Sequence, residues 1–289
     1  MQLSVVIPIY KNAQNAIQQI KNVLKFLNDE YSTFELIFII DDKNIDAQIV
    51  KSLLIDDHVS LYFLDRNHGQ HFATLCGYYI AKGEYIMSID EDMMQYIPQI
   101  STTDVYKENE VVYFNYNKYD MYKSSVRRIL SKLFNNTFLL ISGIKYHSSF
   151  RVISKNMRDN IVNQKRIFYN LDIMLQESTD NIIAVPLNTN GLTDARSSYN
   201  FKTLTTFAFK FIYESNPVLL AALFLFLPAV LFYFYTYNIN QTIAFYAVTV
   251  VMSAVLIFIS KKISKDTKSK IEQALSKQKI KEVALNSSI

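Results

Sequence analysis

Apolar runs and helical periodicity alternate along the first ninety residues of the chain. Runs made mostly of apolar residues, which are typical of buried strands, occupy Leu3–Ile9, Phe34–Ile40, 59–64 and 85–89. Between them, apolar residues recur at the 3.6-residue period of a helix, which predicts helices at about 13–27, at about 47–54 and up to about 81, with Gly83 as the cap of the last one. This alternation predicts an α/β domain with a mainly parallel sheet.

Polar clusters follow three of these predicted strands. They are Pro8 to Asn12, Asp41-Asp42 and Asp90-Glu91-Asp92. Ligands of parallel α/β sheets bind beyond the carboxyl ends of the strands, and right-handed crossovers bring such ends to one edge. An acidic triplet alone is more often a solvated turn. Its place after a buried strand, with a second acidic pair after another strand, favours a shared site instead.

The acidic triplet has the chemistry of a metal site. Two carboxylates one residue apart can share a hard divalent cation, so Asp90 and Asp92 are candidate ligands of Mg²⁺ or Mn²⁺, which would neutralise a diphosphate leaving group. The sequence has no GxGxxG after its first strand and no GxxxxGK[ST], CxxC, HExxH or GxSxG motif, which argues against the corresponding site types. His68, His71 and His147 are scattered, and we expect them to be surface residues or satisfied hydrogen-bond partners.

No charged side chain occurs from Ser215 to Ser260. A short polar separator at 237–240 divides the stretch into two segments of about 20 residues, the length that crosses a hydrocarbon core of about 30 Å. Two buried helices of a soluble core are the alternative, but such helices carry a polar face and these lack one. We therefore predict a hairpin of two transmembrane helices at 215–260. Lysines flank the hairpin and are absent from its turn, so the positive-inside rule places both ends in the cytoplasm.

The flanks of the hairpin complete the predicted organisation. The catalytic domain is expected at 1–198, and 199–214 fits an amphipathic interfacial helix or a helix packed on the domain. The basic tail 261–289 fits a helix near anionic headgroups or, more simply, a solvated cytoplasmic end. A strand-like run begins almost at the N-terminus with no basic region before it, so we expect the catalytic domain not to be exported.

Composition narrows the setting further. The 289 residues suffice for one α/β domain of about 200 residues plus a further segment. The single cysteine, Cys76, excludes an internal disulfide framework and suits a reducing compartment. The net charge of +4 is too small to indicate a nucleic-acid partner.

The strand-end clusters, in this order, resemble those of family 2 glycosyltransferases, and most of all the polyprenyl-phosphate subgroup. The matching segments are Ser4-Val5-Val6-Ile7-Pro8-Ile9-Tyr10-Lys11-Asn12, Ile40-Asp41-Asp42-Lys43-Asn44-Ile45-Asp46, Arg66-Asn67-His68-Gly69-Gln70, Ala81-Lys82-Gly83-Glu84-Tyr85 and Ile89-Asp90-Glu91-Asp92. The resemblance implies a GT-A fold with a Rossmann-like sheet, a nucleotide-diphosphate sugar as donor, and catalytic and metal-binding roles for Asp90 and Asp92. The nucleotide-sugar-binding residues that it implies are Pro8, Tyr10, Asn12, Ile40, Asp41, Asp42, Glu91, Arg66 and Gly69.

Weaker matches lie further along the chain. Ser149-Phe150-Arg151 resembles an arginine motif of the family, and two further arginines precede it at about the family's distance. The resemblance implies a catalytic role for Arg151 and contacts to an acceptor phosphate by Arg127, Arg128, Arg151, Arg196 and Ser198. Residues usual in the family are replaced at Asn12, Lys43, Met94 and Leu192, which leaves the sugar and the nucleotide open.

Three functions follow from these patterns. The first is transfer of a sugar to polyprenyl (undecaprenyl) phosphate at the bacterial inner membrane, the second is extension of a lipid-linked saccharide, and the third is nucleotide-sugar binding without catalysis. A phosphate acceptor is already anionic near neutral pH, whereas a hydroxyl acceptor needs a general base. Asp172 is the one candidate base, and its context indicates a surface helix residue instead. We prefer the first function. The expected partners are then membrane lipid and no nucleic acid, and a homo-oligomer is compatible with the sequence.

Overall fold

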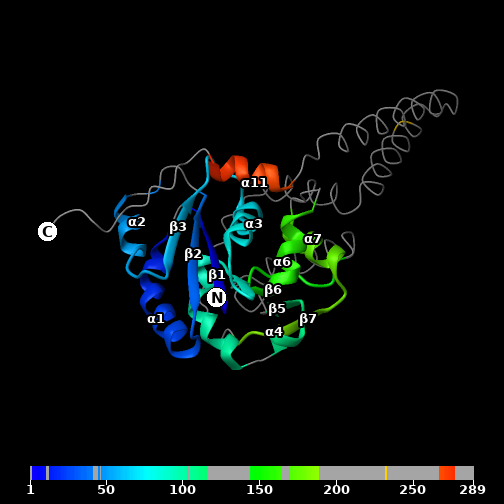
Figure 1. Ribbon diagram of the computed structural model, residues 1–289, viewed down its shortest axis with the longest axis horizontal. Helices are drawn as coiled ribbons and strands as arrows, with labels where there is room; N and C mark the ends of the chain where they lie inside the picture. Colours follow the sequence, from blue (N-terminus) through cyan, green and yellow to red (C-terminus); the bar gives the residue numbers. More distant parts are fainter. Residues whose placement is uncertain are drawn as a thin grey trace.

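The computed structural model describes residues 2–10, 13–41, 45, 47–102, 105–115, 144–164, 170–188, 232 and 267–276 (Figure 1). These residues build one seven-stranded sheet with helices on both faces. The strands are β1 (Leu3–Ile9), β2 (Phe34–Ile40), β3 (Val59–Phe63), β4 (Tyr85–Ser88), β5 (Val111–Asn115), β6 (Arg151–Ser154) and β7 (Ile182–Pro186). The helices are α1 (Gln14–Glu30), α2 (Ala47–Leu53), α3 (Gln70–Ile80), the 3₁₀ helix η1 (Glu91–Thr102), α4 (Val105–Glu108), α6 (Lys155–Val162), α7 (Leu171–Ser178) and α11 (Thr267–Ser276).

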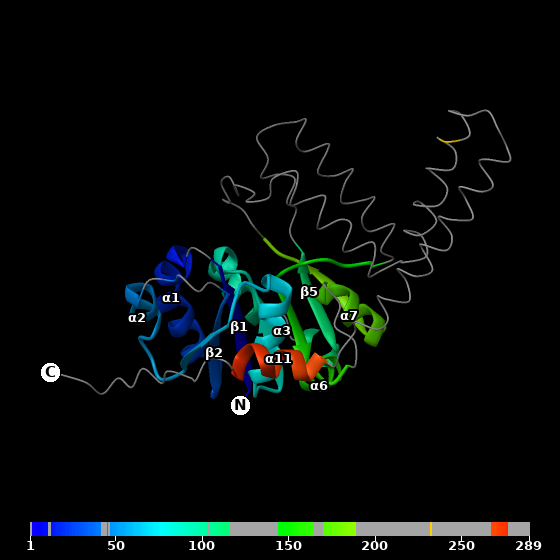
Figure 2. The same ribbon diagram turned by 90° about the horizontal axis from the view of Figure 1, so that it is seen from above.

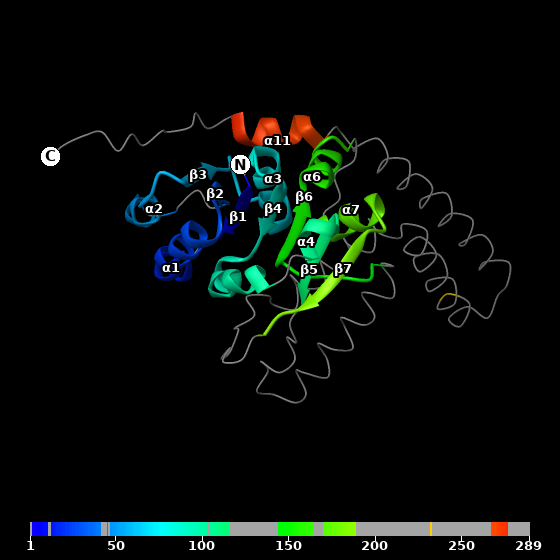
Figure 3. The same cartoon turned by 60° about the horizontal axis from the view of Figure 1, so that its bottom comes forward.

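The strand order in the sheet is β3-β2-β1-β4-β6-β5-β7. Strands β3, β2, β1 and β4 run parallel, β6 is antiparallel to both of its neighbours, and β5 and β7 are again parallel. Figure 3 shows β6, β5 and β7 continuing the sheet beyond β4. The prediction of a mainly parallel α/β sheet is confirmed, and the one antiparallel strand, β6, reverses direction directly beside β4.

Alternate residues of the central strand face two separate cores. Leu3, Val5, Ile7 and Ile9 of β1 pack with α1 and η1 on one face of the sheet. Val6 belongs to the core on the other face, which α3, α6, α7 and α11 cover. All seven residues of β1 are buried, which explains why its sequence is apolar apart from Ser4.

Two glycines let the chain approach β1 closely. A Cβ at Gly77 of α3 would lie 2.1 Å from Cγ1 of Val6, so the helix can approach the strand only without a side chain there. Gly83 does not cap α3, as the sequence suggested, because the C-cap is Ala81. Its N–H instead donates to Oγ of Ser4 at 2.8 Å, and a Cβ at Gly83 would lie 2.6 Å from the Ser4 backbone nitrogen.

Helix α11 lies against α3, as Figures 1 and 2 both show. Ile271 and Ala274 are buried in the core that contains α3, and the hydroxyl of Tyr79 on α3 donates to Oε1 of Glu272 at 2.9 Å. The expectation of a solvated end is therefore wrong for Thr267–Ser276. Burial of the two apolar residues on one helical face supplies the reason.

The predicted membrane segments fall outside the part of the chain that the structure describes. The interfacial segment 199–214 is wholly outside it, and of the hairpin 215–260 only Phe232 is described, in a helical conformation. Among the described residues, no helix has the length and apolar character needed to span a bilayer.

Candidate active site

The carboxyl ends of three parallel strands meet at one edge of the sheet. Ile9 of β1 pairs with Ile40 of β2, and Val6 pairs with Ser88 at the end of β4. The residues that follow these ends are Tyr10, Asp41 and Asp90, so the register places them along one edge. The predicted convergence of the strand-end clusters is confirmed for the described members.

The N-terminus of helix α3 lies at this edge of the sheet. The side-chain amide nitrogen (Nε2) of Gln70, the first residue of α3, donates to Oδ1 of Asp90. Gln70 ends one of the segments that resemble the family, but no role was predicted for it. Its signal was its position, because the residue that opens a helix after a parallel strand faces the carboxyl edge of the sheet.

Asp41 builds the loop before α3. Its carboxylate is buried, with Oδ1 accepting the backbone N–H of His68 and Oδ2 accepting that of Gly69, each at 2.7 Å. Gly69 has a φ of 91°, a left-handed conformation that a residue with a side chain adopts only with strain. Asp41 therefore fixes the backbone of the loop that contains Arg66, the predicted nucleotide-binding arginine, whose side chain is exposed.

The acidic triplet lies where β4 passes into η1. Asp90 and Glu91 are half-buried and Asp92 is exposed. Burial, followed by the charges of Asp92 and Asp90, raises the pKa of Glu91 to about 8, although a hydrogen bond from the Tyr10 backbone opposes the shift. Oε2 of Glu91 is buried and has no hydrogen-bond partner among the described residues. Three successive carboxylates therefore follow the end of β4, and the middle one is held in a partly buried position.

This donor set fits a hard divalent cation. Carboxylate oxygens are the ligands that Mg²⁺ and Mn²⁺ prefer, and a cation at Asp90 and Asp92 would offset the negative charges that add to the effect of burial on the pKa of Glu91. Within the described ranges, no group of three or more His, Cys, Asp or Glu side chains forms a metal cage by itself. Two protein carboxylates would therefore leave the remaining coordination positions to substrate oxygens and water, as is usual for Mg²⁺.

A buried polar layer lies beneath the triplet, on the face of the sheet that α3 covers. Arg151, the first residue of β6, pairs in register with Ser88 of β4 and is only 3% exposed. Its Nη1 donates to Oδ1 of Asp172 at 2.5 Å, and Nδ1 of His147 lies 2.5 Å from Oδ2 of the same carboxylate. The layer therefore holds Asp172 by both oxygens.

Asp172 is not the surface residue that its sequence context suggested. It lies in the first turn of α7 and is 0% exposed, and its N–H donates to the side chain of Asn170, the N-cap of that helix. Burial alone would raise the pKa of Asp172, but Arg151 and then His147 outweigh it and hold the pKa well below its usual range. A carboxylate with so low a proton affinity is a poor general base.

His71 on α3 forms a hydrogen bond with α7 next to Asp172. Its Nδ1 accepts the backbone N–H of Leu171 at 3.3 Å, and burial lowers the pKa of its imidazole to about 3 against the opposing charge of Asp172. His68 pairs with Asp65 at 2.5 Å. The three histidines His68, His71 and His147 are thus satisfied hydrogen-bond partners, as the sequence suggested.

The remaining predicted residues divide into three groups. Pro8 and Ile40 are buried within β1 and β2, and Tyr10 is 46% exposed at the edge. Of the positions where the sequence departs from the family pattern, Met94 is buried and the neighbouring Gln95 is exposed. The residues that lie outside the described part of the chain are Asn12, Asp42, Lys43, Arg127, Arg128, Leu192, Arg196 and Ser198.

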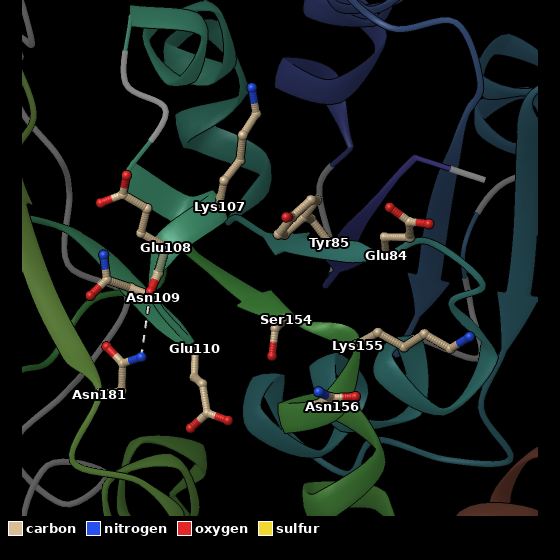
Figure 4. A pocket seen from close by; sticks show the side chains of 10 residues that line it. All are labelled: Glu84, Tyr85, Lys107, Glu108, Asn109, Glu110, Ser154, Lys155, Asn156 and Asn181. Atoms are coloured by element: carbon tan, nitrogen blue, oxygen red, sulfur yellow. Dashed lines mark hydrogen bonds between the residues drawn. The ribbon is translucent and has the colours of Figure 1, made fainter.

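A pocket of about 250 Å³ lies at the other end of the strands (Figure 4). Its lining includes Glu84 and Tyr85 at the start of β4, Ser154 at the end of the antiparallel β6, and Glu110 just before β5. Lys107 and Lys155 also line the pocket, so its lining contains both positive and negative charges. This pocket is separate from the strand-end site.

The sequence of this chain is similar to those of known glycosyltransferases. Residues 4–100 match the model of the family "Glycosyl transferase family 2". An undecaprenyl-phosphate 4-deoxy-4-formamido-L-arabinose transferase of Proteus mirabilis is 31% identical over 108 residues, which is 35% of this chain and 33% of the relative. The corresponding protein of Photorhabdus laumondii is 28% identical over 139 residues, 46% of this chain and 42% of the relative. The matches span a third to under half of the length of these curated relatives.

Solved structures share the fold at low sequence identity. Glucosyl-3-phosphoglycerate synthase from Mycobacterium tuberculosis, in complex with UDP, superposes with a TM-score of 0.51 at 16% identity, covering 74% of this chain and 78% of that one. Mannosyl-3-phosphoglycerate synthase from Rubrobacter xylanophilus also gives a TM-score of 0.51, at 13% identity, with coverage of 74% and 72%. Residues 4–100 belong to glycosyl transferase family 2, and the chain is a distant homologue of the undecaprenyl-phosphate 4-deoxy-4-formamido-L-arabinose transferases.

Proposed function

We propose that this protein is a membrane-anchored inverting glycosyltransferase that moves a sugar from a nucleotide-diphosphate sugar to a polyprenyl phosphate. The family match of residues 4–100 supports the reaction class. The names of the distant relatives, undecaprenyl-phosphate transferases, support the acceptor class. A structure of similar fold, the glucosyl-3-phosphoglycerate synthase from Mycobacterium tuberculosis, was crystallised with Mn²⁺, UDP-glucose and phosphoglyceric acid, which supports the donor class and the metal.

The donor would lie along the edge formed by β1, β2 and β4. The loop that Asp41 fixes, together with Tyr10, would bind the nucleoside. Asp90 and Asp92 would hold Mg²⁺ or Mn²⁺, which supplies charge neutralisation to the diphosphate leaving group when bound. Glu91 stays anchored to the Tyr10 backbone and so ties the acidic triplet to the end of β1.

The burial and pairing of Asp172 are the observation that supports a phosphate acceptor. A saccharide hydroxyl needs a base to take its proton as it attacks, whereas a phosphate oxygen attacks as an anion. Asp172 is 0% exposed, and Arg151 and His147 occupy both of its oxygens, so it cannot reach a hydroxyl. A pre-ionised phosphate acceptor therefore suits this site better than a lipid-linked saccharide.

A transfer assay tests the proposal. The purified full chain, in detergent with Mn²⁺, is incubated with a panel of radiolabelled nucleotide-sugars and undecaprenyl phosphate. We expect one sugar to enter the lipid fraction, and Asp92→Ala to reduce the rate by at least about a hundredfold, the usual scale for loss of electrostatic stabilisation of a leaving group. Asp57→Ala, at an exposed aspartate before β3, is the matched control and should transfer at the wild-type rate.

The other two functions have distinct outcomes in the same assay. Label that enters only an oligosaccharide-lipid, and not undecaprenyl phosphate, would replace the proposed acceptor with a saccharide. Binding of a nucleotide-sugar with no transfer to either acceptor, and with no effect of Asp92→Ala on any product, would leave a non-catalytic binding protein.

A further inference from the structure

The buried guanidinium of Arg151 pairs with one carboxylate, and its strand lies beside the strand that ends at another. Asp172 of α7 pairs with its Nη1 at 2.5 Å. In the β4–β6 ladder, Arg151 stands opposite Ser88, two residues before Asp90. Burial would lower the pKa of Arg151, but Asp172 raises it most, followed by Tyr78, Tyr113 and then Asp90. Asp172 is therefore the main partner of the cation, and the ladder register brings Asp90 to the neighbouring strand end.

The guanidinium also retains bonding capacity. Its Nε is buried and has no hydrogen-bond partner in the part of the chain that the structure describes. Arginine offers five N–H donors, so a guanidinium released from Asp172 would have donors to bind another carboxylate. Asp90 is the carboxylate at the adjoining strand end, and it is also a proposed ligand of the divalent cation.

Two contacts immobilise Asp172. Nδ1 of His147 holds its second oxygen at 2.5 Å, and the Asn170 cap fixes the start of α7 through the Asp172 backbone N–H at 2.7 Å. A carboxylate held in this way keeps the guanidinium on the α7 side of the layer. Without it, Arg151 would be a buried cation lacking its main counter-charge, and such a charge binds the next available carboxylate.

We propose that Asp172 is a positioning residue that holds Arg151 in the buried layer and so prevents this cation from competing with the divalent metal for Asp90. The inference rests on the proposed function, because it requires Asp90 and Asp92 to be metal ligands. It explains why a charged pair is buried directly beneath an acidic site, where apolar residues could fill the same volume.

The test measures metal affinity, with Mn²⁺ alone as the probe. The full chain in detergent is titrated with Mn²⁺, and free Mn²⁺ is followed by electron paramagnetic resonance. In Asp172→Asn we expect the Mn²⁺ dissociation constant to rise about tenfold. Pairing with Arg151 would lower the proton affinity of Asp90 by about one pKa unit or more, and it would lower the affinity of Asp90 for a metal cation in the same way. In Arg151→Gln the competing cation is gone, so Mn²⁺ should bind at least as tightly as in the wild type.

The opposite signs separate positioning from structural support. If Asp172 and Arg151 only stabilised the fold, both single variants would weaken Mn²⁺ binding. The double variant Arg151→Gln/Asp172→Asn removes both charges, and its dissociation constant should return to within about threefold of the wild type. Asp159→Asn, which breaks the surface pair with Arg158 on α6, is the matched control and should leave the affinity unchanged.

Three results would overturn the inference. They are wild-type affinity in Asp172→Asn, weaker binding in Arg151→Gln, and a double variant as weak as Asp172→Asn. If Asp172→Asn fails to fold, the Arg151→Gln and double variants still decide. Failure of the proposed function looks different: Mn²⁺ would not bind the wild type, or Asp92→Asn would bind it normally, and the metal site and this inference would fall together.

Discussion

At the scale of the residue, four aspartates illustrate how environment sets the role of one side chain. Asp92 is exposed, Asp90 is half-buried and held by Gln70, and Asp41 and Asp172 are buried and bonded through both oxygens. Because the buried pair is shielded from solvent and engaged through both oxygens, neither carboxylate is well placed to serve as a base. Their contribution is to hold other groups, a backbone loop in one case and a guanidinium in the other.

Asp41→Asn tests the loop-building role. The amide oxygen of asparagine can accept only one of the two N–H groups of His68 and Gly69, and its NH₂ group would face the other donor. We expect a loss of about 1–3 kcal/mol in the free energy of unfolding, the cost of a buried donor left without its charged acceptor. Chemical denaturation with a fluorescence readout measures it.

A surface aspartate provides the control for this prediction. Asp56 accepts the backbone N–H of His58 at 2.9 Å but is partly exposed, so water can replace the bond in Asp56→Asn. The change there should stay within about 0.5 kcal/mol. Equal losses in the two variants would show that Asp41 contributes no more than an ordinary surface turn.

At the scale of the element, α3 connects the site to the rest of the fold. Its N-terminus carries Gln70 against Asp90, its middle packs on β1 through Gly77, and its last turn carries Tyr79 against α11. The position of Gln70 therefore depends on how closely the helix approaches the sheet.

Gly77→Ala tests that approach. In an exposed helix interior this change stabilises by about 1 kcal/mol, because alanine has the higher helix propensity. Here the new Cβ would lie 2.1 Å from Cγ1 of Val6, so α3 must move away from β1, and we expect a loss of about 1–3 kcal/mol in the free energy of unfolding.

The partner substitution distinguishes a clash from other effects. Val6→Ala removes the methyl groups that the new Cβ would meet, so the double variant should be more stable than the sum of the two single effects predicts. Additive losses, or a stabilised Gly77→Ala, would contradict the close packing of α3 on β1.

The elements that the sequence predicted correctly are those with a local pattern. The four strands β1 to β4 are bounded by turns, and β1 and β2 are almost wholly buried apolar runs, so their bounds were predicted to within one residue. Strands β5, β6 and β7 were not predicted from the sequence. Strand β6 has only four residues and begins with the buried Arg151, and its place between β4 and β5 depends on pairings that no local pattern encodes.

The site divides in the same way. The strand-end position of Asp41 and Asp90 was predicted, because strand ends follow from the apolar runs. The burial of Asp172 was not, because it depends on Arg151 and His147, which are 21 and 25 residues away in the sequence. Charged residues are mostly exposed unless they are paired, so the sequence predicts a surface position for an aspartate whose partner is not known.

At the scale of the whole molecule, α11 constrains how the chain meets a membrane. The helix follows the predicted hairpin in the sequence, yet Ile271 and Ala274 are buried against the face of the domain that contains α3. The domain and Thr267–Ser276 therefore lie on the same side of any membrane that the intervening chain crosses. The number of crossings must then be even, as two predicted spans would give and one would not.

Cysteine labelling tests this sidedness. Lys25→Cys on α1 and Glu272→Cys on α11 each place a thiol at an exposed position, whereas the native Cys76 is buried and its thiol pKa is raised by burial, so it reacts little. A membrane-impermeant maleimide should label both variants in inside-out vesicles and neither in intact spheroplasts, while the parent chain stays unlabelled in both. Labelling of Glu272→Cys from the side opposite to Lys25→Cys would mean that α11 is not docked on α3 in the membrane. Because Tyr79 and Glu272 join these two helices directly, such a result would also remove the link between the C-terminal segment and the helix that carries Gln70.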